Sequence, residues 1–212
     1  MAITRLETNA IGTTIPVTKG GTGVTTSADL ANTGNLVLLS SQTASNDASI
    51  AFNNTLITDT HDTYLLTFRD VDTANDGVSL QLVVSNDNGS SYHTGSSYKR
   101  VTGFGNHGHS NDSSMDKKTQ AANNIVLAGA GLDLGSVDKE TAAGHMWMYN
   151  LRKSDRGKCF FLSSTYEGTT EKGALNFGSV YLDLDLVVNN IRVDASNGNL
   201  SDGTFSLYGL RE

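Results

Sequence analysis

Beyond residue 35, hydrophobic and polar residues alternate with a period of two along most of the chain. In residues 78–85, Ser79, Gln81 and Ser85 fall on one face, and the other face is apolar: Val78, Leu80, Leu82 and Val84. This alternation is typical of antiparallel strands that bury one face. Clusters of Asn, Asp, Gly and Ser separate the runs and favour turns. The pattern predicts strands over residues 36–40, 49–57, 63–71, 78–85, 123–128, 145–151, 158–164, 174–188 and 203–210.

Some of these segments have apolar residues on both faces. In residues 145–151, Met146 and Met148 share one face while Trp147 and Tyr149 share the other, so both faces can be covered. The single cysteine, Cys159, lies in the apolar run 158–162 and is therefore expected in the core. The segment 174–188 is predicted to carry the longest inward stripe, made of Val180, Leu182, Leu184, Leu186 and Val188.

Two carboxylates, Asp183 and Asp185, fall on the other face of the predicted 174–188 strand, with Cα atoms about 7 Å apart. Paired carboxylates at such a spacing can act in glycoside hydrolysis. The stronger interpretation is a solvated strand face that discourages edge-to-edge association. The sequence contains no Gly-x-Ser-x-Gly elbow, phosphate-binding loop or His-Glu-x-x-His motif. We therefore expect no enzymatic activity and no catalytic residue.

Together these segments predict an all-β protein, because helical periodicity is almost absent. A chain of 212 residues can hold one sandwich-sized domain and an appendage. We expect an antiparallel β-sandwich of jelly-roll type over residues 36–212, preceded by an extended N-terminal arm over residues 1–35. The arm ends in one short helix, for which Ser27 offers an N-cap hydroxyl and Gly34 a stop.

The arm has too few apolar residues to form a core of its own. An arm of this length, fully extended, reaches roughly 115 Å. It is interpreted either as an anchor that docks on a partner or winds with its copies, or as a disordered terminus. Three glycines at positions 20, 21 and 23 then form a joint with the body. The candidate partner-binding residues of the arm are Ile3, Leu6, Ile11, Ile15, Pro16 and Val17.

This junction resembles the Gly-Gly-Thr-Gly linker of bacteriophage tail fibres, in which an apolar-Pro stretch precedes the glycines and a small helix follows. Residues 15–17, 20–23 and 25–34 carry the resemblance, which covers roughly the first sixth of the chain. Fibres often repeat the motif along a shaft, whereas here it occurs once, and this argues against a long shaft. The resemblance implies a virion structural protein that forms a homotrimer and docks on other virion proteins through its arm.

Charge and hydropathy exclude two classes of partner. The formal net charge is −7, whereas nucleic-acid binding needs clustered Lys and Arg that neutralise phosphates. The longest apolar run is shorter than a membrane span, and the first residues lack a signal-peptide core. We therefore expect neither a nucleic-acid nor a membrane partner, and a protein made in the host cytoplasm for incorporation into the virion.

Residues 85–92 resemble an Asp-box, a hairpin turn that recurs in sialidases and other β proteins. Asp87 is expected to accept hydrogen bonds from turn amides, Gly89 to supply a positive φ, and Tyr92 to pack under the turn. A single copy cannot build a propeller, which needs blades at a period near 40 to 50 residues. The motif therefore predicts a fixed hairpin and implies no sialidase activity.

The segment 94–118 is rich in glycine and polar residues, so it is predicted to be an exposed loop. Tyr92, Tyr98 and Phe104 are the candidate receptor-contact residues of this region; a loop without a ligand is the alternative. His107 and His109 form a candidate metal site, because three chains around an axis would offer six imidazoles to one ion, as in some phage spike and fibre tips. The alternative is a polar loop that binds no metal. Apart from this possible ion, we expect the protein to have no cofactor.

Three functions remain open at this stage. The first is a short trimeric tail fibre whose body is displayed for assembly or host attachment, with a host-surface glycan as a candidate ligand. The second is a capsid decoration or head-fibre protein clamped by its arm. The third is a carbohydrate-binding module in which Tyr98, Phe104 or Trp147 stacks on sugar rings.

Overall fold

The structure, a computed structural model, describes residues 35–107, 113–130, 132–136, 140–169, 172–182 and 184–211, without the side chains of residues 107 and 113–121. The predicted arm, its glycine joint and its short helix lie outside these residues.

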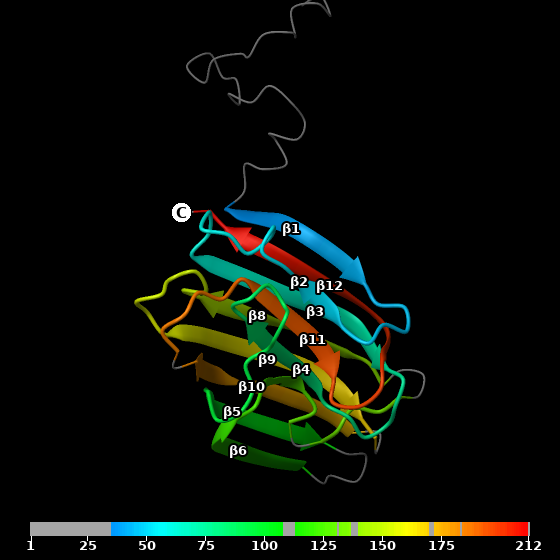
Figure 1. Cartoon of the computed structure of the whole chain (residues 1–212). Coiled ribbons are helices and arrows are strands. Elements are labelled where there is room, and N and C mark those ends of the chain that lie inside the picture. The colour runs from blue at the N-terminus through cyan, green and yellow to red at the C-terminus, as the bar shows by residue number, and fades with distance from the viewer. Residues whose placement is uncertain are drawn as a thin grey trace, which may run out of the picture. The chain divides into compact units, whose positions relative to one another are not determined.

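The described residues form two antiparallel sheets (Figure 1). The larger sheet has eight strands in the order β1-β12-β3-β8-β9-β10-β5-β6, and the smaller has four in the order β2-β11-β4-β7. The strands are β1 (Leu36–Thr43), β2 (Ile50–Phe52), β3 (Thr63–Thr73), β4 (Leu80–Ser85), β5 (Tyr98–His107), β6 (Ser113–Ala122), β7 (Ile125–Ala128), β8 (Ala142–Tyr149), β9 (Lys158–Gly168), β10 (Lys172–Leu182), β11 (Asn190–Ala195) and β12 (Leu200–Leu210).

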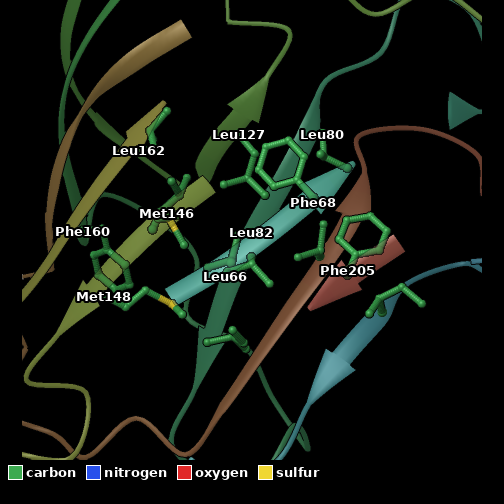
Figure 2. Close-up of a cluster of buried hydrophobic side chains, with 14 of the residues drawn as sticks. Leu66, Phe68, Leu80, Leu82, Leu127, Met146, Met148, Phe160, Leu162 and Phe205 are labelled. Carbon is green, nitrogen blue, oxygen red and sulfur yellow. The ribbon is translucent and has the colours of Figure 1, made fainter. Parts of the chain in front are cut away.

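The core lies between the two sheets and is built by the predicted alternation. Every second residue of β3, β8 and β9 points inward, and Figure 2 shows these side chains meeting Leu80 and Leu82 of β4. Leu66, Met146 and Phe160 are each at most 1% exposed. The predicted all-β class and the antiparallel β-sandwich of jelly-roll type are therefore confirmed.

Side chains of the larger sheet also hold β7, an edge strand of the smaller sheet. The Oγ of Ser164 on β9 donates a hydrogen bond to the Leu127 carbonyl at 2.5 Å. The Nδ2 of Asn176 on β10 donates to the Val126 and Leu127 carbonyls at 3.0 and 3.2 Å. Both side chains are buried, so these polar bonds link the layers inside an otherwise apolar interior.

The prediction of an exposed loop over residues 94–118 is wrong, because most of this segment forms the antiparallel pair β5 and β6. β5 pairs with β10 along its length, from Tyr98 opposite Leu182 to His107 opposite Gly173. β6 pairs with β5 and forms the edge of the larger sheet. The glycines that suggested a loop serve the sheet instead, since a Cβ at Gly103 would lie 2.6 Å from the Phe177 ring.

The predicted strand over residues 174–188 is too long. β10 ends at Leu182, and the chain crosses to the smaller sheet, where β11 pairs with β2 and β4. Asp185 therefore lies in a bend, so it shares no strand face with Asp183, which lies outside the described residues. The inward positions of Val180, Leu182 and Val188 are confirmed, since each is at most 2% exposed.

Candidate functional site: the outer face of the larger sheet

The face of the larger sheet that points away from the core carries large apolar side chains. We call this set the outer apolar face, and its residues are Val101, Trp147, Tyr149, Phe161, Leu175, Phe177 and Tyr181. Six of them are 37% to 56% exposed, and Trp147 is partly buried. They come from four consecutive strands, β8, β9, β10 and β5.

Strand register makes this face continuous. One row of side chains runs across the strands from Trp147 on β8 through Phe161 on β9 and Ser179 on β10 to Val101 on β5. Tyr149 begins the neighbouring row, which continues through Cys159 to Tyr181. Adjacent strands lie about 4.8 Å apart, so side chains in one row are within contact distance of each other.

A shallow hollow of about 620 Å³ lies on this side of the sheet. The residues that define its chemistry are Thr67, His145, Trp147, Ser163, Thr165 and Leu175. Trp147 offers an aromatic surface, and Thr67, Ser163 and Thr165 offer hydroxyls. The hollow can therefore stack on a neutral ring and form hydrogen bonds with it, whereas it offers no lining carboxylate, ammonium or guanidinium group.

Cys159 is exposed on this face, so its predicted place in the core is wrong. In β9 the inward residues are Phe160 and Leu162, and their outward neighbours are Cys159 and Phe161. The apolar run contained both sets, and its composition alone does not indicate which set the smaller sheet covers. The alternation also placed Trp147 and Tyr149 correctly on the face opposite Met146 and Met148.

The Asp-box forms as predicted. The Asp87 carboxylate accepts hydrogen bonds from the Ser85 hydroxyl at 2.6 Å and from the Ser91 amide and hydroxyl at 2.9 and 2.6 Å. These bonds, with that from Ser85 the most important, hold the pKa of Asp87 well below its ordinary value. Gly89 has a φ of 88°, and the Tyr92 ring packs under the Arg192 guanidinium at 4.1 Å.

The three candidate receptor-contact residues have different environments. Tyr92 is partly buried beside the Asp-box, whereas Tyr98 and Phe104 point into the interior at 0% and 8% exposure. The Tyr98 hydroxyl donates to the His93 carbonyl and accepts from the Val84 amide, and burial raises its pKa to about 12. Neither Tyr98 nor Phe104 can therefore stack on a ligand at the surface, which corrects that expectation.

The remaining candidate sites cannot be placed. All six arm residues lie outside the described residues, as do His109 and the side chain of His107. Among the side chains that the structure does describe, no group of three or more His, Cys, Asp or Glu could hold a metal ion. In the same part of the chain, no helix is long and apolar enough to cross a membrane.

Comparison with known proteins yields only distant structural likenesses. No protein-family model matches the sequence, and no curated protein is significantly similar to it. The fold is similar to that of a legume lectin-like domain from Entamoeba histolytica, over 84% of this chain and 85% of that chain. With 12% identity and a TM-score of 0.34, this likeness carries no argument about ligand or activity.

Proposed function

We propose that this chain is a non-enzymatic structural protein of a bacteriophage virion, namely a short tail fibre that assembles as a homotrimer. In this proposal the N-terminal arm docks on other virion proteins, and the sandwich is displayed for assembly or host attachment. The resemblance of the junction to the Gly-Gly-Thr-Gly linker of tail fibres gives the proposal its class of protein.

The observation that carries the proposal is the outer apolar face. Contiguous apolar surface of this kind is unusual on a monomer and marks a place where another molecule binds. A trimer gives such a face a partner, and it also gives the sparse apolar residues of the arm a place to pack.

Native mass spectrometry of the full chain tests the oligomeric part of the proposal. The expected result is a trimer at micromolar concentration, and a monomer there would contradict it. Reconstruction of an assembled particle then tests location. Density for residues Ile3 to Ile15 at the tail supports a fibre, whereas copies on the capsid surface would replace it with a decoration or head-fibre protein.

The hollow beside Trp147 favours a second function, that of a carbohydrate-binding module. Sugar rings stack on indole faces and exchange hydrogen bonds with hydroxyls such as those of Ser163 and Thr165. Binding of the full chain to a glycan array, abolished by Trp147→Ala and retained by Tyr92→Ala, would support this function. An array without any bound glycan would count against it.

A further inference from the structure

None of the seven residues of the outer apolar face is charged, and two of its aromatic rings lie along the sheet. The Phe177 ring lies over Gly103, where a Cβ would be 2.6 Å from the ring, and the Tyr181 ring lies over Gly157 in the same way. These rings therefore lie along the sheet instead of projecting from it. Such a face can line an axis shared by three copies, where each sheet meets the two others.

The distribution of charge over the molecule is compatible with a second copy of the chain binding to this face. The chain carries a formal net charge of −7, so two copies repel each other on average. Among the described outward positions of β8, β9 and β10, from the row of Tyr149 to the row of Leu175, none is Asp, Glu, Lys or Arg. Two copies can therefore approach through this face without placing like charges opposite each other.

The area of this face approaches that of a standard protein contact. Each outward position of a sheet covers roughly 4.8 Å by 6.7 Å. The four rows from Tyr149 to Ala143, extended across β3, β8, β9, β10 and β5, have a charged residue at two opposite corners, Lys99 on β5 and Arg69 on β3. The remaining positions cover about 580 Å² in projection. The accessible area is larger than this projected area, because the side chains protrude from the sheet. For comparison, a standard protein interface buries about 800 Å² on each partner.

We propose that the outer apolar face packs against the same sheet of further copies of this chain, so that the larger sheets face one another inside the oligomer. This inference rests on the proposed homotrimer and names the surface that forms it. Phe161 lies in the middle of the contact. Cys159, two residues before it and on the same face of β9, is covered on assembly. A free sugar in the hollow is the competing occupant.

The variant that tests the contact is Phe161→Glu. Phe161 is 49% exposed in the single chain, so its replacement leaves the fold intact, but in the assembly it would bury an unpaired carboxylate. We expect the concentration at the midpoint of assembly, measured by sedimentation, to rise by more than about tenfold. Leu38→Glu is the matched control, because Leu38 is 54% exposed on β1 and lies outside the face.

The native thiol gives a second readout that does not depend on a variant. Because Cys159 is the single cysteine of the chain, its alkylation rate measures whether this face is covered. We expect alkylation of the wild-type oligomer to be at least about tenfold slower than that of Phe161→Glu under the same conditions. Circular dichroism and thermal unfolding of each variant establish that the fold is retained.

The outcomes separate the inference from the function on which it rests. A wild-type trimer in which Cys159 reacts as fast as in urea overturns this interface and leaves the trimeric fibre standing. A wild-type monomer overturns both. Assembly of Phe161→Glu that is indistinguishable from that of Leu38→Glu also overturns the interface. If Cys159 is open and a saccharide binds in a manner that depends on Trp147, the face belongs to a ligand instead of a second copy.

Discussion

At the residue scale, Asp87 shows how one side chain fixes a loop. Its carboxylate receives hydrogen bonds from Ser85 and Ser91 and thereby closes the turn between β4 and the segment that leads to β5. Because its pKa is lower in the folded than in the unfolded chain, Asp87 stabilises the fold at pH above the unfolded value, near 4. That contribution is lost as the pH falls toward the folded pKa.

We therefore expect Asp87→Asn to lower the urea midpoint of unfolding at pH 7, and the gap to wild type to narrow progressively below pH 4. Urea titrations at pH 7, 4 and 2.5 would measure this gap. Asp70→Asn is the control, because Asp70 is exposed, pairs with the neighbouring Arg69, and has a positive φ that Asn tolerates. A gap that does not change with pH would show that Asp87 acts through packing instead of its charge.

Tyr98 provides the corresponding test at alkaline pH. Burial raises the pKa of its hydroxyl to about 12, so the neutral form is favoured in the fold. Its contribution is fully present below the unfolded pKa near 10, and it is lost as the pH rises toward 12.

Replacement of Tyr98 by Phe removes the acceptor of the Val84 amide and the donor to the His93 carbonyl. We expect a cost of about 1–3 kcal/mol in the free energy of unfolding at pH 8. The difference between wild type and Tyr98→Phe should shrink at pH 11, because there the unfolded wild-type chain is stabilised by ionisation of Tyr98 while the folded chain keeps it neutral. Denaturant unfolding at the two pH values checks this, and a constant difference would contradict it.

At the scale of elements, β7 depends on side chains from the opposite sheet. It pairs with β4 at a few positions only, and Asn176 and Ser164 supply the hydrogen bonds that fasten its carbonyls. We expect Asn176→Ala to cost about 1–3 kcal/mol, since it leaves the Val126 carbonyl buried without a donor. Hydrogen exchange should accelerate in residues 125–128 more than in β3 and β12.

The control for this element is Thr43→Ala, which alters an exposed residue of β1 outside the outer apolar face. It should change neither the stability nor the exchange pattern. If hydrogen exchange in Asn176→Ala instead accelerates equally in every strand, Asn176 stabilises the whole core and does not hold β7 in particular.

Elements could be predicted from the sequence where one face of a strand is apolar and the other polar. β4 has this pattern, and Leu80 and Leu82 are buried as expected. β5 was missed because Gly103 and Gly105 lower strand propensity, and what compensates is the Phe177 ring on a strand far along the chain. β11 was missed because the apolar run 184–188 precedes it and concealed the crossing between sheets.

The same limit applies to the candidate site. In residues 159–162 of β9, apolar residues occur on both faces of the strand. The sequence therefore does not indicate that Phe160 points to the core and Phe161 to the outside. That choice is made by the smaller sheet, whose strands come from four separate parts of the chain. An apolar surface residue could therefore be predicted in this strand, but the face on which it lies depends on long-range pairing.

At the scale of the whole molecule, the buried core residues that the structure describes fall between Ala44 and Leu207, and Leu39 packs against them. A chain that begins at residue 35 should therefore unfold cooperatively, with a melting temperature within about 4 °C of the full-length value, because a change of 1 kcal/mol shifts a domain of this size by roughly that amount. Differential scanning calorimetry of both chains measures this. Loss of a cooperative transition in the shorter chain would show that the first residues complete the fold.

A deletion that also removes β1 is the matched control. It takes away Leu39, which packs against the core, and Ser41, whose hydroxyl lies 2.9 Å from that of Ser206 on β12. The freshly exposed edge of β12 should lower the melting temperature by well over 4 °C and promote aggregation. If the chain from residue 35 is still an oligomer while it melts like the full chain, its sandwich must supply the contact between copies. That result would support the proposed contact through the outer apolar face, and it would leave the arm for the other contacts that we propose.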